Sequence, residues 1–84
     1  MIKMPGIFDE VTEIIRQIED DKSVPKNVVV KLHEICAILN NEDEDRYIRI
    51  DKALQQLENI TDDTNLQPFI RTKIWNISSI LESL

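Results

Sequence analysis

IEDDKSVPKNVVVKLHEICAIL (residues 18–39) aligns without a gap with ITDDTNLQPFIRTKIWNISSIL (residues 60–81), at an offset of 42 residues, half the length of the chain. Two amphipathic helices explain the matching isoleucines and leucines, because apolar residues recur at helical spacing in both. They do not explain the ungapped pair Asp20-Asp21, which meets Asp62-Asp63 in the connection before each second helix. We infer that one helical hairpin occurs twice in the chain.

Four helices are predicted from apolar residues that recur every three to four positions. They cover residues 7–19, 25–40, 43–59 and 66–84. Pro25 and Pro68 suit first helical turns, and residues 42–45 place carboxylates at the start of the third helix, where the helix dipole favours them. Connections of about three to six residues make successive helices antiparallel neighbours. The sequence therefore predicts an all-α protein, a four-helix antiparallel up-and-down bundle built from two similar helical hairpins. It forms one domain, residues 1–84, with repeats at about 1–42 and 43–84.

The same periodicity predicts which residues face the interior. The inward-facing residues are Ile7, Val11, Ile14, Ile15 and Ile18; Val28, Leu32, Ile35, Cys36 and Leu39; Tyr47, Ile50, Ala53, Leu54, Leu57 and Ile60; and Leu66, Ile70, Ile74, Ile77, Leu81 and Leu84. Eight of these are expected to be almost fully buried, namely Ile14, Ile18, Leu32, Ile35, Leu54, Leu57, Ile74 and Ile77. Ser23 or Val24 is the expected cap of the second helix, and Asn65 that of the fourth.

Composition excludes several functional classes. The net charge is −6, which argues against binding a nucleic-acid backbone directly, because that affinity comes from lysines and arginines. A single glycine cannot build a phosphate-binding loop, and a single cysteine, Cys36, excludes an internal disulfide. No signal peptide or membrane-length apolar run is visible, so we expect a cytoplasmic protein that does not enter a membrane. We predict no cofactor and no catalytic residues.

Residues 62–84 resemble the C-terminal signature of a family of short archaeal proteins, uncharacterised family 0147 of the UPF series. Its pattern is close to D-P-N-M-P-x-x-x-R-T-x-I-W-x-I-x-S-x-L-E. The matching residues are Asp63, Asn65, Arg71, Thr72, Ile74, Trp75, Ile77, Ser79, Leu81 and Glu82, and in the first half Asp21, Val24, Pro25 and Asn27 resemble the family's D-x-x-V-P-x-N. The chain departs from the pattern at Thr64, Gln67, Val29 and Val30, where prolines and arginines are usual. The resemblance implies an all-helical archaeal cytoplasmic protein and supplies no activity.

Four aspartates are the candidates for a metal site. If the hairpin repeats, Asp20, Asp21, Asp62 and Asp63 lie at one end of the bundle. The alternative is that these carboxylates serve the helix starts that follow them, and we favour this interpretation. His33, the only histidine, is interpreted as a surface residue, because the sequence does not place Cys36 or a second ligand beside it.

Trp75 is the candidate for an interface. On an ideal helix it lies about 145° from the centre of the apolar stripe of its helix, together with Thr72 and Ser79. Arg71 precedes Trp75 by one turn, and arginine and tryptophan are both enriched in binding hot spots. The alternative is that Trp75 packs under residues 1–5.

These observations favour a non-enzymatic helical protein-interaction module, which binds a protein partner or a second copy as a homodimer. The competing hypothesis is a small metal-dependent protein or enzyme that uses the aspartate cluster.

Overall fold

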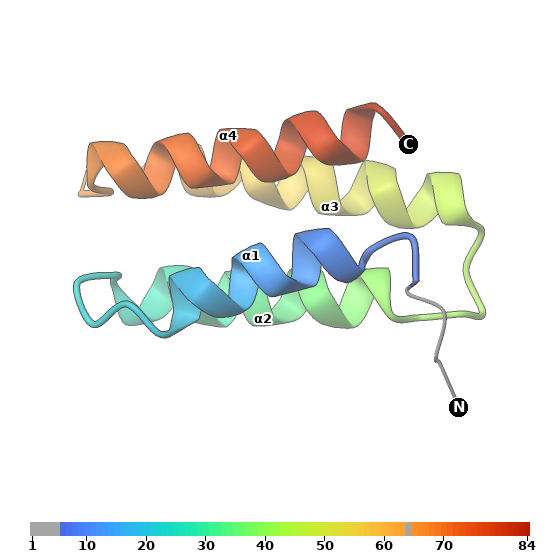
Figure 1. The fold of residues 1–84 in the computed structure, drawn as a ribbon, viewed down its shortest axis with the longest axis horizontal. Coiled ribbons are helices and arrows are strands. Elements are labelled where there is room, and N and C mark those ends of the chain that lie inside the picture. Colours follow the sequence, from blue (N-terminus) through green and yellow to red (C-terminus); the bar gives the residue numbers. More distant parts are fainter. Residues whose placement is uncertain (1–5, 64) are drawn as a thin grey trace.

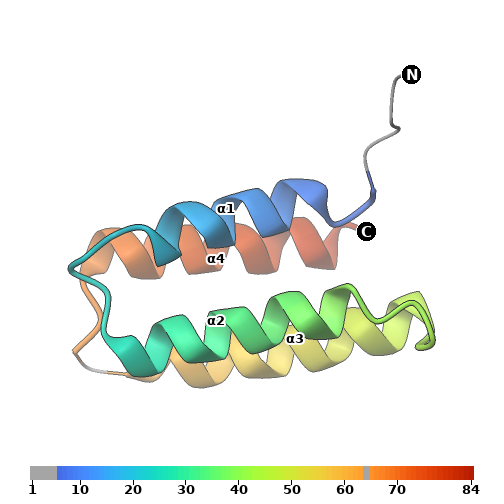
Figure 2. The same ribbon diagram turned by 90° about the horizontal axis from the view of Figure 1, so that it is seen from below.

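The structure is a computed structural model that describes residues 6–63 and 65–84. These residues form four helices: α1 (Asp9–Glu19), α2 (Lys26–Leu39), α3 (Arg46–Thr61) and α4 (Pro68–Glu82). Each helix packs against two others: α1 contacts α2 and α4, and α3 contacts the same two helices. Figures 1 and 2 show the four helices side by side along the long axis of the molecule, with each helix antiparallel to the next and the four axes at the corners of a square. The predicted all-α up-and-down bundle is therefore confirmed.

The helix boundaries follow the offset of 42 residues. Helices α2 and α4 begin at Lys26 and Pro68, and α1 and α3 end at Glu19 and Thr61. The connections that follow α1 and α3 lie at the same end of the bundle (Figure 1). Helix α3 departs from the repeat, because it begins at Arg46, five residues before the position that corresponds to the start of α1. Its first turn extends beyond the other three helices (Figure 1).

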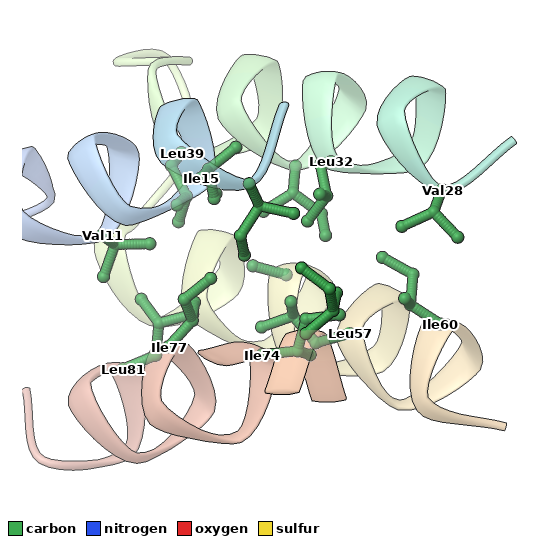
Figure 3. Packing of buried hydrophobic residues seen from close by; sticks show 14 of the residues in the cluster. Val11, Ile15, Val28, Leu32, Leu39, Leu57, Ile60, Ile74, Ile77 and Leu81 are labelled. Carbon is green, nitrogen blue, oxygen red and sulfur yellow. The ribbon is translucent and has the colours of Figure 1, made fainter. Parts of the chain in front are cut away.

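The core consists of residues that are apolar in both repeats. In the part of the chain that the structure describes, 18 hydrophobic side chains are buried, and they form nine pairs separated by 42 residues: Phe8 and Ile50, Val11 and Ala53, Ile15 and Leu57, Ile18 and Ile60, Val24 and Leu66, Val28 and Ile70, Leu32 and Ile74, Ile35 and Ile77, and Leu39 and Leu81. Figure 3 shows side chains from all four helices converging on the bundle axis. Equivalent helices therefore present the same face to the interior.

Two of the eight residues predicted to be almost fully buried are only partly buried. Ile14 and Leu54 pack against the core from its flank, whereas the other six are buried. The residues 42 positions away are Gln56 and Thr12, and these are also partly buried. Both positions therefore lie at the edge of the stripe, where a polar side chain is tolerated. Cys36, also predicted to face inward, is partly buried in the same way.

Three residues predicted to face inward are exposed. Tyr47 is 65% exposed because it belongs to the first turn of α3, which extends beyond α2 and α4, the two helices that α3 packs against (Figure 1). Ile7 precedes α1 and Leu84 follows α4, so neither is held against the core by a helix. The apolar period continues past the ends of the packed region, and this is why it misplaced these three residues.

The predicted helix caps also differ from the structure. Asp45 is the cap of α3 and accepts a hydrogen bond from the Tyr47 N–H at 2.9 Å, so residues 42–44 precede the helix and do not form its first turn. The residues before α2 and α4 are Pro25 and Gln67. Ser23 and Asn65, expected as caps, lie two residues further out and belong to the connections.

Within the described part of the chain, no helix is both long and apolar enough to cross a membrane.

Candidate interaction site

The α3–α4 groove is a hollow of about 230 Å³ between the two helices of the second hairpin. It is lined by Leu54, Leu57, Glu58 and Thr61 of α3 and by Trp75, Ser78 and Glu82 of α4. Trp75 lies outside the buried stripe of α4 and is 58% exposed, although it is the largest side chain of the groove. Leaving apolar area in water costs about 25 cal/mol per Å², so covering this surface with another protein is favourable.

The other interface candidates are divided by the structure. Thr72 and Ser79 are exposed on α4, as Trp75 is. Arg71 is partly buried and turns toward the preceding connection, where its guanidinium donates a hydrogen bond to the Asp63 carbonyl oxygen at 3.0 Å. Its Nε atom is buried and has no hydrogen-bond partner among residues 6–63 and 65–84. Arg71 therefore holds the start of α4 to the α3–α4 connection.

The aspartates form turns in the two equivalent connections. Asp21 accepts hydrogen bonds from the N–H and the hydroxyl of Ser23, at 2.9 and 2.6 Å. Asp63 accepts one from the N–H of Asn65 at 2.9 Å, and its other carboxylate oxygen accepts one from the Asn27 side chain at 3.4 Å. These carboxylates therefore accept hydrogen bonds from residues of the connections, and not from the first N–H groups of α2 and α4 as expected from the sequence.

Asp20 and Asp62 occupy the C-terminal caps of α1 and α3, where their backbone N–H groups continue the helical hydrogen bonding. Over residues 6–63 and 65–84, no three histidine, cysteine, aspartate or glutamate side chains are arranged to hold a metal ion.

The hydroxyl of Ser23 and then its N–H hold the pKa of the Asp21 carboxyl below its usual value of 3.8. We expect Ser23→Ala to raise the pKa of Asp21 toward that value, because the stronger of the two hydrogen bonds is lost. A lowered folded-state pKa stabilises the fold above pH 3.8, and this contribution disappears as the pH falls through the folded-state value. Carbon chemical shifts of the Asp21 carboxyl, followed against pH, measure the change.

Ser23→Thr is the control for this titration, because it keeps the hydroxyl and should keep the low pKa. An unchanged Asp21 titration in Ser23→Ala would contradict the assigned cause.

The α1–α2 groove is a second hollow, of about 310 Å³, and it contains His33 and Cys36 together with Arg16 and Glu19. Sequence reasoning did not place Cys36 beside His33, but the structure brings both into this groove. Burial, and then the charge of Glu19, raise the pKa of the Cys36 thiol. A raised pKa leaves less thiolate at neutral pH, which is the opposite of what a nucleophilic cysteine needs.

Sequence reasoning missed the contact between Phe8 and Arg49. Phe8 is buried at the start of α1, and the Arg49 guanidinium lies 5.4 Å from the centre of its ring. The same guanidinium donates a hydrogen bond, at 2.9 Å, to the carbonyl oxygen of Leu39, which is the last residue of α2. Phe8 corresponds to Ile50 in the repeat, so comparing the two halves position by position was the signal that would have placed it in the core.

The fold is a small up-and-down four-helix bundle made of two equivalent hairpins, and Trp75 lines a groove of the second hairpin that is open to solvent. The chain belongs to the uncharacterised protein family UPF0147, whose family profile matches residues 2–84. The resemblance expected from the sequence is thereby confirmed.

Relatives in this family come from archaea. The UPF0147 protein of Methanothermobacter thermautotrophicus is 42% identical over 77 residues, which are 92% of this chain and 76% of that protein. The UPF0147 protein of Methanosarcina mazei is 38% identical over 78 residues, 93% of this chain and 84% of its own. The crystal structure of unknown function protein MMP1188 matches with a TM-score of 0.89 at 28% identity, and covers all of this chain and 98% of that chain.

Proposed function

We propose that this protein is a non-enzymatic interaction module that binds another protein through the face of α4 around Trp75. The observation that carries the proposal is the tryptophan in the α3–α4 groove, 58% exposed, beside the partly buried Leu54. Tryptophan is among the residues most enriched in binding hot spots, and it loses little conformational entropy when it is covered. Exposed Thr72 and Ser79 on the same helix supply polar atoms for the rim of such an interface.

A catalytic role has less support. Of the four aspartates considered as metal ligands, Asp21 and Asp63 accept hydrogen bonds in turns, and the pKa of the Cys36 thiol is raised, which leaves less reactive thiolate. The competing metal-dependent hypothesis therefore has no arrangement of side chains in its favour among the described residues.

The repeat provides a matched control for testing the interface. Ser79 and Ala37 are both exposed and occupy equivalent positions, 42 residues apart, on α4 and α2. A photo-crosslinking amino acid at position 79 is expected to capture a small set of proteins from archaeal cytoplasm, and Trp75→Ala should remove these products. The same probe at position 37 should not give them.

Identical products from both positions would contradict the proposal. A product of two copies of the chain that sediments as a dimer, and that Trp75→Ala dissociates, would identify the interface as that of a homodimer. Circular dichroism is the folding control, and the Trp75→Ala variant is expected to keep the helical signal of the wild type. Whether residues 1–5 cover Trp75, the alternative raised by the sequence, lies outside the described residues.

A further inference from the structure

The two grooves are copies of one another. The α1–α2 groove is lined by Thr12, Arg16, Glu19, His33, Cys36 and Asn40. Each of these residues lies 42 positions before a residue that lines the α3–α4 groove. The core positions beneath the grooves have kept their apolar character in both halves. Because the core beneath them is equivalent, the two grooves differ in their lining side chains, and comparing these side chains shows how the two surfaces have diverged.

The divergence makes the α3–α4 groove both more apolar and more acidic. Trp75 stands where the first half has His33, and Leu54 stands where it has Thr12. In the same groove, Glu58 stands where the first half has Arg16 and Glu82 where it has Asn40, and none of the described residues that line it is a lysine, arginine or histidine. An apolar surface whose charged neighbours are carboxylates is complementary to an apolar side chain bordered by cations.

The carboxylates border the apolar pair on both sides. Glu58 lies one helical turn beyond Leu54 on α3, and Glu82 lies two turns beyond Trp75 on α4. Because α3 and α4 run in opposite directions, these two displacements point toward opposite ends of the groove (Figure 1). A groove between two antiparallel helices accepts a third helix along its length, which is a recurring mode of peptide recognition.

We propose that the α3–α4 groove binds a positively charged amphipathic helix of another protein. An apolar side chain of that helix contacts Leu54 and Trp75, and lysines or arginines on either side of it pair with Glu58 and Glu82. This inference rests on the proposed function and specifies its partner. The net charge of −6 favours a cationic partner over a second copy, because two copies repel each other.

The test uses two fluorescein-labelled helical peptides that share a leucine face, one with a lysine polar face and one with a glutamate polar face. Fluorescence anisotropy with the whole protein measures binding. The lysine peptide is expected to bind and the glutamate peptide is not. The double variant Glu58→Gln, Glu82→Gln should weaken binding of the lysine peptide about 3- to 10-fold, as expected for two exposed charge pairs. Trp75→Ala should weaken it about 10-fold or more.

Matched variants separate the groove from the general negative charge. Glu10 and Glu34 are exposed on α1 and α2, so Glu10→Gln, Glu34→Gln changes the net charge equally away from the groove. His33→Ala is the equivalent of Trp75→Ala in the other half. Both controls should leave the affinity within about twofold of the wild type.

Failure of the lysine peptide to bind, or an equal loss in the control double variant, would overturn the assignment of a basic helix. The proposed function would stand in that case if the products captured from position 79 still depended on Trp75. If those products are also absent, the interaction face itself is wrong.

Discussion

Leu32→Ala is expected to lower the free energy of unfolding by about 2–5 kcal/mol. Leu32 is completely buried on α2, and its counterpart Ile74 is completely buried on α4. Figure 3 shows both side chains within the cluster at the centre of the bundle. Removing three carbons there loses transfer free energy and leaves a cavity that rigid neighbouring helices fill only partly. A domain of this size has about 5–15 kcal/mol in total, so the variant loses a large fraction of its stability.

Urea unfolding followed by circular dichroism measures this loss. Val30→Ala is the matched control, because Val30 is on the same helix, two residues away, and is 57% exposed. It should change the free energy of unfolding by about 0.5 kcal/mol or less. A loss below about 1 kcal/mol for Leu32→Ala would contradict the placement of Leu32 at the centre of the core.

Phe8→Ala is expected to cost about 3–5 kcal/mol, although Phe8 precedes the first residue of α1. Phe8 is only 6% exposed, and it contacts Arg49, whose guanidinium also binds the carbonyl oxygen of Leu39 at the end of α2. Truncation exposes the apolar surface that it covers and removes the ring beneath the Arg49 guanidinium. Two contributions are therefore lost together, burial of an aromatic ring and a cation–π contact of about 0.5–1 kcal/mol.

Thermal and urea unfolding of Phe8→Ala, Arg49→Ala and the double variant separate the two contributions. In this double-mutant cycle, the losses of the two single variants should not add up to the loss of the double variant, because each single variant removes the same contact. Ile7→Ala is the control, since Ile7 is adjacent but 48% exposed, and it should cost less than about 1 kcal/mol. A loss in Phe8→Ala no larger than that of Ile7→Ala would show that Phe8 does not belong to the core.

The sequence determined most of this fold because helical periodicity and the repeat point to the same structure. Both the periodicity and the repeat predict four helices, and both place Leu32, Ile35, Ile74 and Ile77 in the core, where they are buried. Errors arose where periodicity was used without the repeat. Ile14 and Leu54 fit the apolar period, but their counterparts Gln56 and Thr12 are polar, which marks a flank position. Among the pairs that are apolar in both halves, only Ile38 and Ile80 are not buried.

The candidate site was less accessible from the sequence. The angular position of Trp75 predicted that it leaves the buried stripe, and it is exposed. The Arg71 side chain points toward the α3–α4 connection because it donates a hydrogen bond to the Asp63 carbonyl oxygen there. Helical spacing alone does not predict this contact. The grooves depend on how neighbouring helices are separated, so pairing Trp75 with Leu54, or His33 with Cys36, required the packed structure.

The connection between α2 and α3 lies at the same end of the bundle as the start of α1 and the end of α4 (Figure 1). Packing therefore does not fix which hairpin comes first along the chain. A circularly permuted protein that reads α3, α4, α1, α2, with a short linker from Leu84 to Gly6 and new ends within residues 40–45, retains every helix neighbour of the original. Two molecules that open at the same connection can likewise exchange hairpins, and each half then completes its core with the equivalent half of the other molecule.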